Sequence, residues 1–77
     1  LSKTEQRLLR VLVENRGHAV SRSDLIDRVW SEESAFVEEN ALSVSVKRLR
    51  AKLERDPAHP QWLCTVRGIG YEWRREL

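Results

Sequence analysis

NALSVSVKRLRAKL, residues 40–53, is the stretch of this chain that decides its fold. Four apolar side chains recur at the spacing of helical turns and predict a buried stripe, formed by Leu42, Val46, Leu49 and Leu53. The opposite arc of the same helix holds Asn40, Val44, Lys47, Arg48 and Ala51. This outer arc is basic and includes a valine, unlike the glutamate and lysine coat of an ordinary surface helix. A helix with one buried face and one cationic, partly apolar face suits a groove of DNA.

Four side chains of the outer arc are candidates for contact with nucleic acid. Arg48 has two donors for a guanine edge, a contact worth roughly 1–3 kcal/mol of discrimination, whereas lysines such as Lys47 more often meet phosphate as a point charge. Which of the two contacts a base is left open, and the alternative is that both are solvated helix charges. Val44 would contact a thymine methyl or be an ordinary exposed apolar residue. Asn40 would bond adenine or phosphate, or cap the helix, and capping is favoured.

Arg50 and Ser43 lie at the flank of the predicted helix, around 90° from the apolar stripe. Side chains at a flank reach the walls of a groove, where the phosphates lie, rather than the base edges. We therefore expect phosphate contact from both residues. For Arg50 a salt bridge with an acid of the preceding helix is an equal alternative.

Length and composition limit the chain to one small domain, residues 1–77, with a net charge of +2. Charge is unevenly distributed, because residues 1–39 hold six Lys/Arg and eight Asp/Glu, whereas residues 40–77 hold eight and four. Neither a signal peptide nor an apolar run near 18 residues is present, so no membrane segment is expected. The single Cys64 excludes an internal disulfide and favours a reducing, cytoplasmic location. Since the chain starts at Leu1 and lacks methionine, we expect a fragment of a longer protein.

Two further helices are predicted upstream, over residues 3–14 and 22–30. Ser2 and Glu5 form a capping-box pattern at the start of the first, and Gly17 suits a left-handed cap after its end. A serine also precedes the second helix as its N-cap. The short segment between the two helices is expected to be extended or a brief strand.

The C-terminal part of the chain changes from helical to strand periodicity. Residues 61–66 and 71–74 are rich in aromatic and β-branched side chains and flank RGIG at 67–70, a turn with two glycines. Three helices followed by a β-hairpin predict a winged helix, an α+β fold. Arg67 at the hairpin tip is placed to enter a narrow minor groove, or is a solubilising turn residue. Thr65 is placed to donate to phosphate.

An acidic connection over residues 31–39 repels phosphate and is therefore a candidate surface for contact with another protein. Phe36 within it is either an exposed anchor or, as we favour, folded onto the core. Trp62, Tyr71 and Trp73 of the hairpin could stack on single-stranded bases, but we expect at least two of them in the core.

No residue set in the chain indicates an enzyme, a cofactor or a metal site. His18 and His59 are far apart in sequence and Cys64 has no second cysteine, so a zinc site is not expected. The glycines of the RGIGY motif lie between two predicted strands, which does not fit a phosphate-binding loop that opens a helix.

The motifs LSKTEQRLLRVL, VSRSDLIDRVW, SVKRLRAKLE and TVRGIGY together resemble the DNA-binding effector domain of the OmpR/PhoB response regulators. The resemblance extends over nearly the whole chain, and RLRAKL followed by TVRGIGY is its most specific part. It implies a winged helix-turn-helix that regulates transcription by binding double-stranded DNA. The third helix would enter the major groove and the wing would touch the minor groove.

The resemblance further implies a receiver domain controlled by a sensor kinase, dimers on direct repeats, and contact with RNA polymerase through the 31–39 loop in some members. Most members carry a small sheet before the first helix, which would lie upstream of Leu1 and is absent here. Ala41, Ser43 and Ser45 replace the family's frequent Thr, Asp and His, so its base preferences are not transferred. Two alternatives stay open: a DNA-binding regulator without a receiver, and a winged helix that binds proteins.

Overall fold

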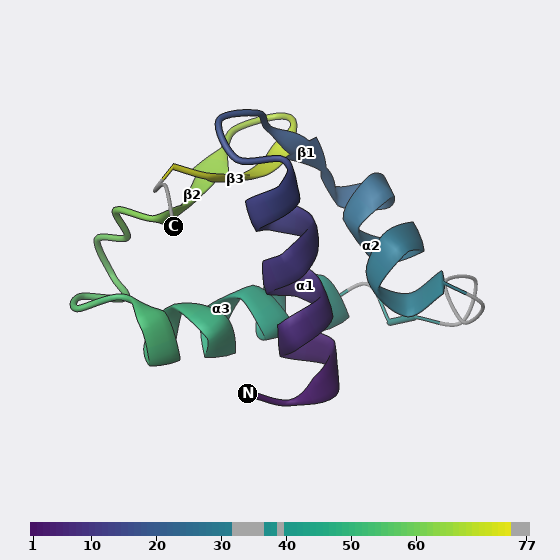
Figure 1. Ribbon diagram of the computed structural model, residues 1–77, viewed down its shortest axis with the longest axis horizontal. Coiled ribbons are helices and arrows are strands. Elements are labelled where there is room, and N and C mark those ends of the chain that lie inside the picture. The colour runs from purple at the N-terminus through teal and green to yellow at the C-terminus, as the bar shows by residue number, and fades with distance from the viewer. Residues whose placement is uncertain (32–36, 39, 75–77) are drawn as a thin grey trace.

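The computed structural model describes residues 1–31, 37–38 and 40–74. Their elements, in chain order, are α1 Lys3–Glu14, β1 Val20–Ser21, α2 Arg22–Trp30, α3 Ala41–Leu53, β2 Leu63–Val66 and β3 Gly70–Trp73. In Figure 1, α1 crosses α3 and packs on it, α2 lies along the other side of α1, and the sheet lies at the C-terminal end of α1. The predicted α+β winged helix is therefore confirmed.

The start of α1 has the capping box that the sequence predicts, whereas its C-cap is Asn15 and Gly17 lies two residues beyond that cap. Glu5 N–H donates to Ser2 Oγ at 3.2 Å and Ser2 N–H donates to Glu5 Oε2 at 3.1 Å, so the capping box is complete. Gly17 has a φ of 81°, in the left-handed region that glycine adopts without strain. Its N–H donates to the Trp73 carbonyl at 2.9 Å, which attaches the end of α1 to β3.

The caps of α3 differ from the prediction. Asn40 holds the N-cap position but makes no side-chain capping hydrogen bond, so the predicted capping role is wrong. Its backbone is already near-helical (φ −89°, ψ −5°), not in the extended conformation typical of a capping residue. After the other end, the buried Glu54 carboxylate accepts N–H groups of Gln61, Trp62 and Leu63 at 2.8 to 3.3 Å. Glu54 therefore fixes the loop that leads from α3 to the wing.

The sheet is antiparallel with strand order β1-β3-β2, so the predicted hairpin gains a third strand. The pairing of β1 with β3 depends on Gly70, because a Cβ there would lie 2.1 Å from the Val20 carbonyl oxygen. Gly68 has a φ of 76° and supplies the left-handed conformation of the turn itself. The two glycines of the turn motif thus have different roles: one shapes the turn and the other lets two strands approach.

A single apolar cluster joins the helices to the sheet, and its buried members are Leu8, Leu12, Val20, Leu25, Val29, Leu42, Val46, Leu49, Leu63, Tyr71 and Trp73. Of the predicted α3 stripe, only Leu53 is not fully enclosed and is half-buried. Burial of Tyr71 and Trp73 confirms that at least two hairpin aromatics belong to the core. The Trp62 ring is half-buried, 6.4 Å from the Trp73 ring between centroids. Phe36 lies outside the described residues.

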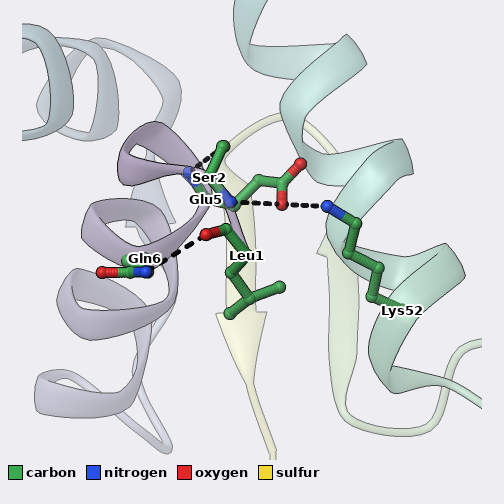
Figure 2. A network of polar contacts seen from close by, with 5 residues as sticks. All are labelled: Leu1, Ser2, Glu5, Gln6 and Lys52. Carbon is green, nitrogen blue, oxygen red and sulfur yellow. Dashed lines mark hydrogen bonds and ion pairs between the residues drawn. The ribbon is translucent and has the colours of Figure 1, made fainter.

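An ion pair joins the first turn of α1 to the last turn of α3, as Figure 2 shows. Lys52 Nζ lies 2.5 Å from Glu5 Oε2, and Glu5 is only 4% exposed. The hydrogen bond from Lys52, with the Ser2 N–H as a second donor, holds the pKa of the Glu5 carboxyl below its ordinary value. Glu5 therefore caps α1 and anchors α3 with the same carboxylate.

Candidate nucleic-acid interface

The outer arc of α3 is open to solvent. All five of its members are exposed: Asn40, Val44, Lys47, Arg48 and Ala51. Val44 keeps 42% of its surface exposed, which is high for a valine on a packed helix. In the described part of the chain, neither Lys47 nor Arg48 has an ion-pair or hydrogen-bond partner. The arc thus combines two unneutralised cations with an apolar group at its centre.

Arg50, at the flank of α3, is tied to the sheet. Its Nε donates to the Leu63 carbonyl at 3.0 Å and one Nη donates to Thr65 Oγ1 at 2.8 Å. The acids of α2, Asp24 and Asp27, do not pair with it, so the alternative of a salt bridge to that helix is wrong. A guanidinium has five N–H donors, and those left over by these two bonds remain available to a phosphate.

Arg22, which the sequence did not single out, lies at the same flank. From the first position of α2 its Nη1 donates to the Tyr71 hydroxyl at 3.0 Å and its Nη2 to Ser43 Oγ at 3.2 Å. The guanidinium carbons of Arg22 and Arg50 lie 5.9 and 5.7 Å from the centroid of the Tyr71 ring. One signal could have found Arg22: a cation in the first turn opposes the helix dipole and therefore does not serve the helix that carries it.

The wing presents its tip to solvent. Ile69 N–H donates to the Val66 carbonyl at 3.1 Å and closes the turn, on which Arg67 is exposed and Ile69 keeps 53% of its surface. Thr65, also exposed, pairs with Tyr71 across β2 and β3. Within the described residues, Arg67 has no hydrogen-bond or ion-pair partner.

The predicted residues therefore fall into three groups. The outer arc of α3 holds Asn40, Val44, Lys47 and Arg48. At the flank, Ser43, Arg50 and Thr65 lie around Tyr71. Arg67 lies apart from both groups, on the turn of the wing. Of the two serines that depart from the family pattern, Ser45 is buried whereas Ser43 is exposed. Of these two serines, only Ser43 therefore has its side chain on the exposed surface of α3.

Other kinds of site find little support in the described ranges. Among these residues, no group of three His, Cys, Asp or Glu side chains could hold a metal ion. None of the described helices has the length and apolar character needed to cross a bilayer. Of the acidic connection, the structure describes Ser31, Val37 and Glu38, and the remaining residues of the predicted protein-contact surface lie outside the described ranges.

Comparison with known proteins places this geometry in context. Residues 1–73 match the family model described as "Transcriptional regulatory protein, C terminal". The sensory transduction protein RegX3 of Mycolicibacterium smegmatis is 49% identical over 65 residues, which cover 84% of this chain and 28% of that protein. The chain therefore spans less than a third of the length of this curated relative.

Two solved structures have the same fold. The response regulator DrrB of Thermotoga maritima, an OmpR/PhoB homologue, superposes with a TM-score of 0.86 at 32% identity, covering 97% of this chain and 33% of that one. The DNA-binding domain of Klebsiella pneumoniae RstA, solved in complex with the RstA box, gives a TM-score of 0.82 at 26% identity, covering 96% of this chain and 72% of that one.

Proposed function

This chain belongs to the family of C-terminal domains of transcriptional regulatory proteins, of the OmpR/PhoB type, and on that premise we propose that it binds double-stranded DNA sequence-specifically. It is a regulatory domain and not an enzyme. In the proposed arrangement it is the output domain of a two-component response regulator. The solved complex of RstA with the RstA box supports duplex DNA as the ligand class.

The observation that carries this proposal is the outer arc of α3, where an exposed valine lies beside two cations that have no partner among the described residues. Arg48 and Lys47 contact a base edge and phosphate, and Val44 contacts a thymine methyl. Asn40, freed from capping, bonds adenine or phosphate from the start of the same helix. A helix that only contacted solvent would gain nothing from an exposed valine between cations.

Two neighbouring regions complete the proposed contact surface. Ser43, Arg50 and Thr65 contact the phosphates at the groove wall, because they lie at the flank of α3 and beside it on β2. Arg67 enters the adjacent minor groove from the wing tip, where the potential of DNA is most negative. This division gives α3 the sequence preference and gives the flank and wing much of the affinity.

Several finer assignments follow from the family and are part of the proposal. The domain binds direct repeats as a head-to-tail dimer, and residues 31–39 contact RNA polymerase. A receiver domain elsewhere in the longer protein controls it, in the cytoplasm. The match covers only 28% of the length of the curated relative RegX3, which supports the presence of a further domain.

Selection of duplexes from a random DNA pool, followed by titration of the selected duplex at several salt concentrations, tests the function. We expect one enriched motif and tighter binding to it than to a scrambled duplex. Four predicted cations (Lys47, Arg48, Arg50 and Arg67) would give a slope of log affinity against log salt of about −3 to −4. If no motif is enriched and the affinity for DNA does not change with salt concentration, DNA recognition is contradicted. That result would favour a winged helix that binds proteins.

A further inference from the structure

Three hydroxyl groups at the junction of α2, α3 and the sheet act as acceptors for two guanidinium groups. Arg22 donates to the hydroxyls of Tyr71 and Ser43, and Arg50 donates to that of Thr65. A hydroxyl that accepts a hydrogen bond keeps its own hydrogen for a different acceptor. Among the described residues, none of these three hydrogens has an acceptor. The cluster therefore presents three hydroxyl hydrogens beside the N–H groups of two guanidiniums, so its unused polar groups are mainly donors.

The same cluster carries two positive charges without an anion. In the described part of the chain, no carboxylate pairs with Arg22 or Arg50. Both guanidinium groups lie instead against the ring of Tyr71, whose negative face attracts cations but does not neutralise them. A site of donors with excess positive charge fits a ligand that has acceptors only and a negative charge, which is the description of a phosphodiester.

The geometry of the cluster is fixed by four elements. Ser43 and Arg50 are seven residues apart, about 10 Å along one side of α3. Thr65 and Tyr71 are opposite one another across β2 and β3. From α2, Arg22 donates hydrogen bonds to the hydroxyls of both Tyr71 and Ser43. Tyr71 is only 7% exposed and forms the base of the cluster, whereas Ser43 and Thr65 are at the surface.

We propose that Arg22 is a positioning residue of the DNA interface. By donating to the lone pairs of Ser43 and Tyr71, it leaves their hydroxyl hydrogens to donate to an oxygen of one backbone phosphate, as Arg50 does for Thr65. This assignment rests on the proposed function and deepens it, because it adds Arg22 and Tyr71 to the phosphate contacts proposed for the flank.

The test is a scan of the selected duplex in which each phosphate near the bound motif is replaced, one at a time, by a neutral methylphosphonate. We expect one replacement to weaken wild-type binding about tenfold, as a lost charge-assisted contact would. Arg22→Lys keeps the charge but loses the planar pair of donors, so the same replacement should cost it less than threefold. Tyr71→Phe and Ser43→Ala remove the hydroxyls themselves and should show the same reduced sensitivity at that position.

Arg28→Lys, the same substitution in the last turn of α2, is the matched control and should keep the full tenfold loss. Thermal unfolding of each variant identifies any that fail to fold. Should Arg22→Lys or Tyr71→Phe fail to fold, Ser43→Ala still tests the assignment, because Ser43 is exposed and its substitution leaves the core unchanged. The assignment is overturned if Arg22→Lys weakens binding to native and substituted duplexes by the same factor, since that is the behaviour of a merely structural residue. Wild-type affinity for Arg22→Lys would also overturn it, whereas absence of any DNA binding by the wild type would overturn the proposed function as well.

Discussion

Two pairs of cations lie within two turns of α3 and have different surroundings. We call Lys47 and Arg48 the outer pair, and Arg50 and Lys52 the inner pair. The outer pair is exposed and, in the part of the chain that the structure describes, has no partner. Arg50 is bonded to the Leu63 carbonyl and to Thr65 on β2, and Lys52 is paired with Glu5 on α1. The outer pair is therefore free to meet a ligand, whereas the inner pair holds α3 against the sheet and α1.

This difference means that the number of cations in KRLRAK overstates the charge available to DNA. Lys52 is opposed by Glu5, and Arg50 has already used two of its donors within the domain. A substitution in the outer pair should therefore change binding alone, and one in the inner pair should change the stability of the fold as well. Three variants test that contrast, in decreasing order of expected effect.

Arg48→Ala should give the largest effect. We expect the affinity for the selected duplex to fall about tenfold to a hundredfold, because a bidentate contact to a base is worth roughly 1–3 kcal/mol. The free energy of unfolding should change by less than about 0.5 kcal/mol, since Arg48 is exposed. Titration at fixed salt and urea denaturation measure the two quantities. Arg10→Ala, an exposed cation of α1, is the control, and equal losses of affinity in both variants would mean that only overall charge matters.

Arg50→Lys should have an intermediate effect, and on stability. It keeps the charge but loses the two-pronged bond to β2, so we expect the free energy of unfolding to fall by about 1–2 kcal/mol. Urea denaturation of Arg50→Lys and of Arg48→Lys measures the free energy of unfolding of each variant. Only Arg50→Lys should be destabilised. Equal stability of the two variants would remove the distinction between the outer and inner pairs.

The local parts of this fold could be predicted from the sequence because they depend on neighbouring residues. Helical periodicity predicted the bounds of α1 and α2, and the capping box of Ser2 and Glu5 involves bonds within three residues. The exposed arc of α3 follows from the same periodicity. These features need no knowledge of how the elements pack.

The missed parts depend on contacts between distant segments. The pairing of β1 with β3 joins Val20 to Tyr71, and its need for a glycine at position 70 is visible only once the strands are adjacent. Arg22 reaches Tyr71 across 49 residues of sequence, so no local pattern predicts that bond. Asn40 shows the opposite failure, because a residue type with high capping preference has a backbone conformation that does not present its side chain to the helix.

The smallest effect on the free energy of unfolding is expected from loss of the ion pair between Lys52 and Glu5. The Lys52 side chain is 49% exposed, so solvent partly screens the interaction. The pKa of Glu5 is below its ordinary value of 4.5, mainly because of the hydrogen bond from Lys52. Above pH 4.5 Glu5 is ionised in both the folded and unfolded chain, and its stabilising contribution is fully present. As the pH falls below that value the unfolded chain binds the proton first, so this contribution is lost progressively until the folded carboxyl is also protonated.

Glu5→Gln keeps an acceptor for the Ser2 N–H and removes the charge that faces Lys52. Its loss of stability relative to wild type should therefore be largest at neutral pH and shrink as the pH falls below 4.5, which urea denaturation across a pH series measures. Some acid dependence should persist in the variant, because the hydrogen bond from His59 also lowers the pKa of Asp56. Glu14→Gln, an exposed acid at the other end of α1, is the matched control. A loss for Glu5→Gln that is the same at every pH would mean that Lys52 is held to α1 by something other than the charge of Glu5.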